Sequence, residues 1–199
     1  MLCLLAGSAS AATGNPEKIL VFGDSLSAGY GIAVAQSWPA LLQTRLQQDR
    51  LPYTVINASI SGETTAGGNS RLPAALKAHR PRIVILALGA NDGLRGLPVE
   101  AMRANLEAMI DAAQTAGARV LLVGMQLPPN YGPDYTRRFG ASFGDIARQR
   151  KLAWLPFLLE PIALDDSAFQ PDRLHPTAAA QPRLMEHVWQ ALRPVLKPG

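Results

Sequence analysis

The segment Gly23-Asp24-Ser25 places a serine hydroxyl where an apolar run ends and a loop begins. A serine at such a junction is well presented for attack on an acyl carbonyl, provided that a base removes its proton. Asp and Ser also cap turns and helices, because their side chains accept hydrogen bonds from nearby backbone N–H groups. The segment by itself therefore predicts either a nucleophile or a cap.

His175 is the best placed of the three histidines to act as that base. It lies in a loop-like stretch after the last apolar run, three residues beyond Asp172, so one turn can bring the carboxylate to Nδ1 of the imidazole. His79 and His187 lie in helical patterns among charged residues, where solvated positions are the default. We predict that Asp172 and His175 form the pair. The alternative is a helix N-terminus with an acidic cap and a surface histidine.

Two further segments offer hydrogen-bond donors for the oxyanion that forms during acyl transfer. Residues 57–62 end in Gly62, whose N–H can approach a substrate without an obstructing Cβ. Residues 89–92 supply the side-chain amide of Asn91. Each segment is also an ordinary turn, since Gly, Asn and Asp favour turns. Their joint occurrence after successive apolar runs favours an oxyanion hole.

Apolar runs predict the strands that must position these residues. The predicted strands cover residues 19–22, 53–56, 83–88, 120–125 and, more weakly, 153–157. Helical patterns cover residues 38–48 and 98–116, and a long final helix is predicted from Pro176 to about Leu196. The third and fourth runs contain VILAL and VLLVG without polar alternation, which is typical of strands covered on both faces.

Strand and helix alternate along the chain, and this order predicts an α/β protein, a three-layer α/β/α sandwich with about five parallel strands. Ligands of such sheets bind beyond the carboxyl ends of the strands, where the candidate residues fall. The chain has 199 residues, of which 48% are hydrophobic and 17% charged, enough for one substantial core but short for two. We predict a single domain over residues 13–199.

Residues 1–12 have the pattern of a signal peptide. A short apolar stretch runs into small residues, and Ala9-Ser10-Ala11 fits the small-x-small cleavage rule, although no Lys or Arg precedes it. We expect a periplasmic or secreted protein. The only cysteine, Cys3, lies in this leader, so the mature domain would hold no disulfide, thiolate nucleophile or multi-cysteine metal site. No other segment approaches the roughly 18 consecutive apolar residues of a membrane helix, so stable membrane insertion is not expected.

The formal net charge of +4 and the pI of about 9.6 raise the question of nucleic-acid binding. The nineteen Lys and Arg residues are dispersed, with short groups only at Arg137-Arg138 and residues 148–151. A solvated helix face explains these groups better than a nucleic-acid site. The charge would attract anionic substrates mildly, with a rate that falls as salt is added.

Taken together, the segments around the candidate residues resemble the SGNH, or GDSL, hydrolase family over nearly the whole chain after the leader. The stretches NASISGETTAGG, ANDGLRG, QLPPNYG and AAQP resemble, more narrowly, the bacterial periplasmic group of multifunctional acyl-CoA thioesterases, arylesterases and lysophospholipases. The resemblance implies a flavodoxin-like sandwich with no metal and no organic cofactor. Our motif search agrees, since we find no Gly-rich phosphate loop and no metal-ligand cluster.

The resemblance also implies a role for each candidate residue. Ser25 would be the nucleophile, and its backbone N–H would form the oxyanion hole together with Gly62 and Asn91. His175 would act as general base and then as general acid, and Asp172 would orient it.

Three positions depart from the pattern of that group. Glu63 stands where an aspartate is usual, Ala90 where a second glycine is usual, and Arg173-Leu174 where a smaller pair precedes the histidine. None of these changes removes a catalytic group. Ala90 could alter the backbone beside Asn91 and Arg173 could add charge near the cleft, so they bear on substrate preference rather than on the chemistry.

The implied activity is hydrolysis of carboxylic esters and thioesters, including aryl esters, acyl-CoA and lysophospholipids, through an acyl-enzyme intermediate. The partner would be a small-molecule acyl ester or thioester, and the protein would be a monomer. We expect the acyl chain in a cleft built from the loops after the third and fourth strands, although ordinary loop packing would also explain each residue. The residues predicted to line this cleft are Leu94, Leu97, Leu127, Pro128, Pro129 and Tyr131.

Two other functions compete with this one. A carbohydrate O-deacetylase, a type that the wider family also contains, would need exposed aromatic residues for stacking on sugars, but only 6% of the residues are aromatic. A non-catalytic flavodoxin-like binding module would keep the pocket without turnover. The complete set of candidate residues argues against such a module.

Overall fold

The computed structural model describes residues 16–196. The predicted signal peptide and Cys3 lie outside the described residues. The strands are β1 (Glu17–Gly23), β2 (Tyr53–Asn57), β3 (Ile83–Ala87), β4 (Arg119–Val123) and β5 (Ala153–Leu155). The helices are α1 (Ser25–Ala28), α2 (Trp38–Gln48), α3 (Thr65–His79), α4 (Ala90–Leu94), α5 (Val99–Thr115), α6 (Pro133–Arg150) and α7 (Gln181–Leu196). Short 3-10 turns lie at η1 (Val34–Gln36), η2 (Pro129–Tyr131), η3 (Glu160–Ile162), η4 (Asp166–Ala168) and η5 (Ala178–Ala180).

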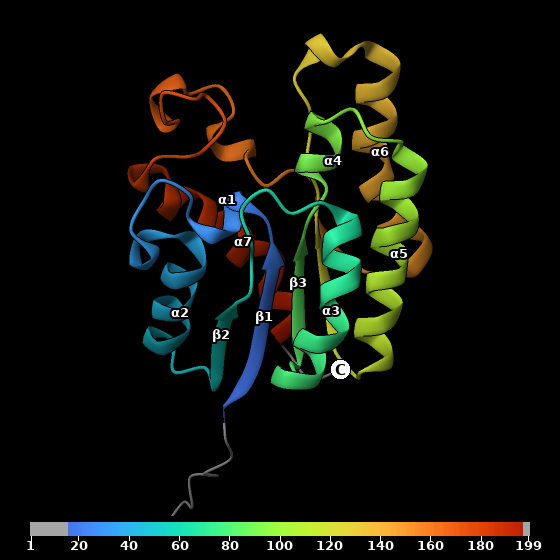
Figure 1. Cartoon of the computed structure of the whole chain (residues 1–199). Helices are drawn as coiled ribbons and strands as arrows, with labels where there is room; N and C mark the ends of the chain where they lie inside the picture. The colour runs from blue at the N-terminus through green and yellow to red at the C-terminus, as the bar shows by residue number, and fades with distance from the viewer. Residues whose placement is uncertain (1–15, 197–199) are drawn as a thin grey trace, which may run out of the picture.

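The strands form one parallel sheet in the order β2-β1-β3-β4-β5. Because all of them run in the same direction, their carboxyl ends meet at one edge of the sheet (Figure 1). From β1 the chain moves to β2 on one side, then crosses back to β3 on the other side of β1 and continues outward to β4 and β5. This reversal leaves a crevice beyond the ends of β1 and β3, where ligands of such sheets bind.

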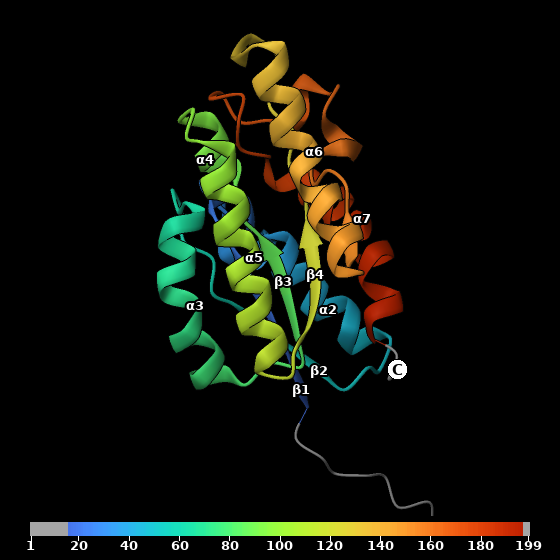
Figure 2. The same cartoon turned by 90° about the vertical axis from the view of Figure 1, so that its right-hand side faces the viewer.

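Alternate side chains of each strand enter two separate apolar cores. Ile19 and Val21 of β1 pack with α2 and α7, whereas Leu20 and Phe22 pack with α3, α5 and α6. Figures 1 and 2 show these helix layers on opposite faces of the sheet. Because both faces are covered, the strands carry apolar residues at successive positions. The prediction of a three-layer α/β/α sandwich with about five parallel strands is confirmed.

Two of the long helices, α3 and α6, were not delimited by the sequence pattern. Helix α3 contains Gly67, Gly68 and Pro73, which weaken a helical pattern. Gly68 is required by packing, because a Cβ there would lie 2.4 Å from a side-chain carbon of Leu88. Helix α6 contains Gly144, where a Cβ would lie 3.0 Å from the ring of Trp154. Close packing therefore selected residues that local helix propensity disfavours.

The final helix starts later than the sequence predicts. Residues near Pro176 are held against an earlier loop, because Phe169 and Pro176 form an isolated antiparallel bridge and Thr177 N–H donates to the Ala168 carbonyl at 2.8 Å. Helix α7 follows only at Gln181. Strand β5 is also shorter than predicted and ends at Leu155, where Pro156 lacks the N–H needed to extend the ladder.

The basic groups of α6 lie on its exposed side, as expected for a solvated helix face. Four arginines there pair with acidic residues, so little of their positive charge is uncompensated. The pairs are Arg137 with Asp134, Arg138 with Glu100, Arg148 with Asp145, and Arg150 with Asp111. Within residues 16–196, no helix combines the length and apolarity that a membrane span requires.

Candidate active site

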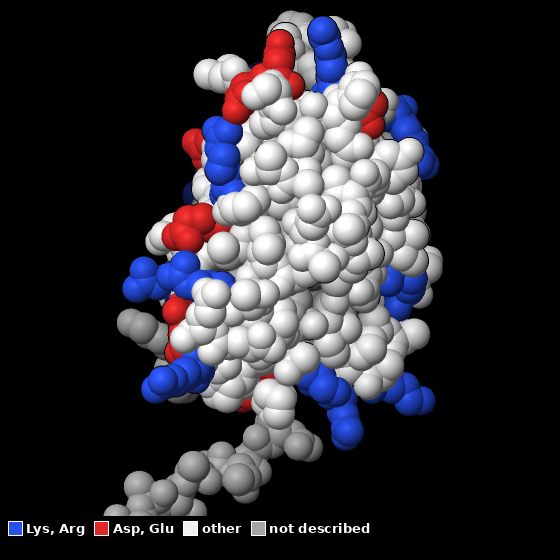
Figure 3. Space-filling view, turned by 90° about the vertical axis from the view of Figure 1, so that its left-hand side faces the viewer, with Lys and Arg blue, Asp and Glu red and all other residues white. Residues whose placement is uncertain are grey.

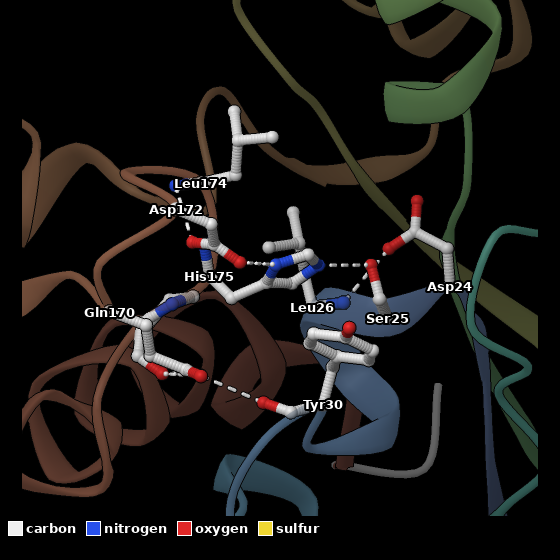
Figure 4. A network of polar contacts seen from close by, with 9 residues as sticks. Asp24, Ser25, Leu26, Tyr30, Gln170, Asp172, Leu174 and His175 are labelled. Carbon is white, nitrogen blue, oxygen red and sulfur yellow. Dashed lines mark hydrogen bonds and ion pairs between the residues drawn. The ribbon is translucent and has the colours of Figure 1, made fainter.

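Ser25, His175 and Asp172 form a continuous chain of polar contacts at the carboxyl edge of the sheet. The Nε2 atom of His175 lies 2.8 Å from Oγ of Ser25, and its Nδ1 atom lies 2.7 Å from Oδ2 of Asp172. Figure 4 shows the imidazole between the hydroxyl and the carboxylate. When Nδ1 donates its proton to the carboxylate, Nε2 is left as an acceptor for the serine proton.

The end of β1 positions Ser25 at the start of a short helix. Asp24 is extended, and its Oδ1 accepts the Leu26 N–H at 3.1 Å, so it caps α1 while Ser25 is the first helical residue. The segment therefore contains a cap as well as a hydroxyl aimed at His175. Gly23 lets α1 approach β3, because a Cβ there would lie 2.9 Å from the Ala87 carbonyl oxygen.

A tight turn holds Asp172 and His175 in place. Oδ1 of Asp172 accepts the backbone N–H groups of Leu174 at 2.9 Å and of His175 at 3.0 Å, and Arg173 between them has φ +57°. These backbone bonds and the bond from the imidazole lower the pKa of Asp172 to about 2. The turn does not begin a helix, and His175 faces Ser25, so the alternative of a helix cap with a surface histidine is wrong.

Tyr30 and Gln170 support the histidine, and sequence reasoning missed both. The Tyr30 ring lies 4.4 Å from the His175 ring between centroids, at an angle of 36° (Figure 4). Gln170 Nε2 donates to the carbonyls of Tyr30 at 2.8 Å and Pro176 at 3.0 Å. The Gln170 N–H donates to the His175 carbonyl at 2.8 Å. Gln170 thus ties the loop of the histidine to the loop that follows α1.

Gly62 and Asn91 lie beside Ser25 on the wall of the same cleft. Gly62 has φ +79°, a backbone conformation that favours glycine. Within residues 16–196 we find no acceptor for the backbone N–H of either Ser25 or Gly62. The Asn91 amide donates to the Glu63 carbonyl at 3.0 Å and, more weakly, to Oδ2 of Asp24 at 3.3 Å. Ser25, Gly62 and Asn91 thus bring potential hydrogen-bond donors to one cleft.

Asp24 is a buried carboxyl group next to the candidate nucleophile. Its side chain is only 1% exposed, and burial raises its pKa to about 6. The Leu26 N–H and the nearby charge of His175 favour the ionised form and oppose part of this shift. Asp24 is therefore a second titratable group in contact with the site, apart from His175.

Asp92 fixes the loops that carry Gly62 and Asn91. Its buried carboxylate accepts the Thr65 N–H at 2.8 Å and the Thr65 hydroxyl at 2.5 Å. Thr65 begins α3 directly after the Gly62 loop, and Asp92 lies in α4. Glu63, which stands where the resembling group usually has an aspartate, is also held in place, since its carboxylate pairs with Arg71 at 2.7 Å.

An apolar cleft of about 680 Å³ opens next to Ser25. Four of the predicted residues line it, namely Leu94, Leu127, Pro128 and Pro129. Leu97 and Tyr131 do not, which corrects the expected lining. The Tyr131 hydroxyl donates to the Leu94 carbonyl at 3.2 Å, and its ring packs against the core behind the wall. Leu97 is exposed, and its carbonyl accepts the Tyr135 hydroxyl at 2.7 Å.

The opposite wall of the cleft was not foreseen. It comes from the segment after β5, whereas the predicted cleft was built only from the loops after the third and fourth strands. The residues of this wall are Phe157, Leu159, Ala163, Phe169 and Leu174. Arg173 and Asp166 also line the cleft, so the charge expected from Arg173 is present there together with an acidic residue.

The other two histidines lie apart from this site. His187 was expected to be solvated, but its side chain is only 22% exposed and its Nε2 atom lies 3.0 Å from the Phe157 carbonyl oxygen. Its place on α7 next to a cleft-wall segment explains the difference. His79 is the last residue of α3 and is half-buried.

Comparison with known proteins agrees with this fold. The model of the GDSL-like lipase/acylhydrolase family matches residues 21–182. The esterase TesA of Pseudomonas aeruginosa is 48% identical over 195 residues, covering 98% of this chain and 94% of that protein. The thioesterase 1/protease 1/lysophospholipase L1 of Escherichia coli K12 is 39% identical over 195 residues, covering 98% and 90%.

Solved structures give the same result. A crystal structure of TesA superimposes with a TM-score of 0.87 at 49% identity, covering 90% of this chain and 99% of that one. A psychrotrophic esterase EstA from Pseudoalteromonas, inhibited by monoethylphosphonate, has a TM-score of 0.87 at 39% identity and coverages of 90% and 98%.

A parallel α/β sandwich with a Ser–His–Asp contact chain at its switch point has the architecture of a hydrolase. Within that class, the chain belongs to the GDSL-like lipase/acylhydrolase family. Its similarity to TesA and to the E. coli enzyme extends over nearly the full length of both, so the resemblance inferred from the sequence motifs is confirmed.

Proposed function

We propose that this protein hydrolyses carboxylic esters and thioesters by nucleophilic catalysis, with Ser25 as the nucleophile. The observation that carries this proposal is the 2.8 Å contact between Ser25 Oγ and His175 Nε2, backed by the 2.7 Å contact between His175 Nδ1 and Asp172. An imidazole held in this way can take the serine proton as the hydroxyl attacks. The relatives named as esterase, arylesterase and thioesterase support the same chemistry.

In the acylation step, Ser25 Oγ bonds to the carbonyl carbon while His175 Nε2 takes its proton. The tetrahedral oxyanion would be held by the N–H groups of Ser25 and Gly62 and by the Asn91 amide. The amide already has two acceptors, Glu63 O and Asp24 Oδ2, and the longer bond to Asp24 is the one more easily exchanged for the oxyanion. Collapse of the intermediate expels the alcohol or thiol, which receives the proton from His175.

Water then hydrolyses the acyl-enzyme with the same groups. His175 takes a proton from the water, the new tetrahedral intermediate collapses, and Ser25 recovers its proton as the carboxylic acid leaves. Asp172 remains ionised throughout, because its pKa of about 2 is far below neutral pH. Two-step kinetics with an initial burst of the first product are expected.

The cleft favours an acyl group as the substrate part that is held. Its walls are mainly apolar, which suits a hydrocarbon chain better than a sugar. An O-deacetylase of carbohydrates is therefore not favoured. Comparing the turnover of an acetylated sugar with that of a medium-chain acyl thioester separates the two activities.

The first test is hydrolysis of p-nitrophenyl esters from acetyl to palmitoyl, with acyl-CoA alongside, by the wild type and Ser25→Ala. We expect the activity to peak at one chain length and to disappear in the variant. A fluorophosphonate should label Ser25 in the active protein. Activity that survives Ser25→Ala would overturn the assignment of the nucleophile, and binding without any turnover would favour a non-catalytic module.

Export, domain extent and oligomeric state also belong to this proposal. We infer that residues 1–12 direct export to the periplasm or the medium and that residues 13–199 form the hydrolase domain, which acts as a monomer. The small-x-small pattern at Ala9-Ser10-Ala11 supports export. N-terminal sequencing of the processed protein from a periplasmic fraction and sedimentation of the purified protein test these points.

A further inference from the structure

The exposed large apolar side chains are gathered at one end of the molecule. Within residues 16–196 these side chains are Tyr30, Val34, Ile60, Leu97, Leu164 and Leu174. Each lies in a segment that follows the carboxyl end of a strand, which is the end that carries the cleft. Single exposed apolar residues are ordinary when they are scattered over a surface, but their concentration at one site usually marks a binding face.

Five of these exposed residues lie in the cleft lining or in the segments that continue from it, and we call them the mouth patch: Tyr30, Val34, Ile60, Leu164 and Leu174. Tyr30 and Leu174 line the cleft themselves. The other members are next to lining residues in the chain. Ile60 precedes Ser61 and Gly62, and Leu164 follows Ala163; Ser61, Gly62 and Ala163 line the cleft.

Val34 is assigned to the mouth patch because of its position in the chain, shortly after Tyr30. It lies in η1, which follows the Tyr30 loop, and Gln170 ties that loop to the Pro176 segment by its 2.8 Å and 3.0 Å hydrogen bonds. Val34 and Leu164 are the most exposed members of the patch, at 68% and 102%. Both side chains are therefore available for contact with another surface.

Two of the segments that carry the mouth patch have no charged residue, and the charges that flank the other members are of both signs, with Arg95 and Arg173 on one side of the balance and Asp165, Asp166 and Asp172 on the other. Residues 25–44 contain no Asp, Glu, Lys or Arg, and neither do residues 53–62. Figure 3 shows a broad uncharged area on the side of the molecule that carries α2 and β2, with the charged side chains mostly at its margin. Arg173 and Asp166 at the cleft have opposite charges. Docking on anionic lipid relies on clusters of Lys and Arg, which this face lacks.

We propose that the mouth patch seats the protein on the surface of a zwitterionic lipid aggregate, such as a phosphatidylcholine bilayer or a lysophospholipid micelle. The proposal rests on the proposed function, since it supplies the route by which an acyl chain enters the cleft. A chain that passes directly from the aggregate into the cleft avoids the cost of exposing each CH₂ to water. A second copy of the protein on the same face would close the cleft, so it is the less suitable occupant.

The experiment is flotation with phosphatidylcholine vesicles, using Ser25→Ala protein so that no lipid is consumed. We expect the Ser25→Ala protein to float with the vesicles. Adding either Val34→Asp or Leu164→Asp should weaken binding roughly tenfold, because each substitution places a charge where an apolar side chain meets lipid. Gln114→Asp is the matched control, since it makes the same charge change on the exposed end of α5 at the opposite edge of the sheet. The control should bind like the Ser25→Ala protein.

A second readout separates docking from folding and from chemistry. In proteins that retain Ser25, Val34→Asp and Leu164→Asp should leave hydrolysis of soluble p-nitrophenyl butyrate unchanged while lowering hydrolysis of micellar lysophosphatidylcholine several-fold. A wild type that lacks activity on the soluble ester would contradict the proposed function, whatever the flotation result.

Several results would overturn the docking proposal while leaving the chemistry intact. They are failure to float with phosphatidylcholine, flotation that is insensitive to both aspartates, and binding that requires anionic lipid. A dimer in sedimentation that Val34→Asp dissociates would assign the patch to a second copy of the chain instead.

Discussion

Asp172 holds His175 at two points: one carboxylate oxygen lies 2.7 Å from the ring Nδ1, and the other accepts the backbone N–H of the same histidine at 3.0 Å. The carboxylate thereby fixes the position of the residue and the tautomer of its ring. A single turn of four residues accounts for both contacts, with Arg173 in the left-handed conformation at its centre.

Asp172→Asn should lower kcat by about 10²- to 10⁴-fold with little change in KM. The asparagine can keep the backbone bonds, but its NH₂ group would face Nδ1 and favour the tautomer that carries the proton on Nε2, which cannot accept from Ser25. Asp165→Asn is a suitable control, because Asp165 is paired with Arg183 outside the contact chain. Steady-state kinetics on a soluble ester test this, and a fall of less than threefold would exclude an orienting role for Asp172.

Asn91→Ala should lower kcat by about 10²- to 10³-fold, because it removes one donor to the oxyanion. Gly62→Ala tests the neighbouring donor in a different way. A Cβ at Gly62 would meet only Arg95 Nη2, at 3.8 Å, so steric crowding is absent and the cost is the strain of φ +79°, about 1 kcal/mol of stability. We expect a lower kcat and a modest drop in melting temperature. An unchanged kcat in both variants would place the oxyanion elsewhere.

Asp24 should make the stability of the protein depend on pH. Its pKa is raised from 3.8 to about 6, so the folded state binds the proton more tightly than the unfolded state. The stability of the wild type, compared with Asp24→Asn, should therefore fall as the pH rises from about 4 to 6, by about 3 kcal/mol in total. Urea unfolding of both proteins at pH 4 and pH 8 measures this change. A difference between them that stays constant with pH would contradict the raised pKa.

Asp92→Ala should destabilise the protein by about 3 kcal/mol, because it leaves the buried N–H and hydroxyl of Thr65 without their acceptor. The loops of Gly62 and Asn91 depend on that contact, so kcat should fall as well. Asp111→Ala removes a surface carboxylate paired with Arg150 and should change stability by less than about 0.5 kcal/mol. Equal destabilisation by the two variants would show that the Asp92 contact is not a structural anchor.

Ala163→Trp should shorten the acyl chains that the enzyme accepts, because it enlarges a side chain on the cleft wall after β5. We expect the rate on the longest p-nitrophenyl esters to fall at least tenfold, while the acetyl ester is hydrolysed normally. Tyr131→Phe is the control, since Tyr131 does not line the cleft. A chain-length profile that responds to Tyr131→Phe but not to Ala163→Trp would restore the cleft first inferred from the sequence.

The fold class and the residues of the contact chain could be predicted from the amino-acid sequence. Runs such as VILAL without polar alternation indicate strands covered on both faces, and the parallel order follows from their alternation with helices. Ser25, Gly62 and Asn91 could be found because each follows a strand, and the carboxyl ends of parallel strands must meet. His175 could be chosen because the chain has only three histidines and one of them lies near an aspartate in a loop.

Three features follow only from the packing of the folded chain: the second wall of the cleft, the position of Tyr30 beside His175, and the absence of Leu97 and Tyr131 from the lining. The segment between β5 and α7 is built from 3-10 turns and irregular loops, so it has no periodicity from which side-chain directions can be read. Regular elements repeat the same burial every two or every three to four residues, and a local pattern records it. The contact of Gln170 with the Tyr30 carbonyl joins residues 140 positions apart, and only the packed chain brings them together.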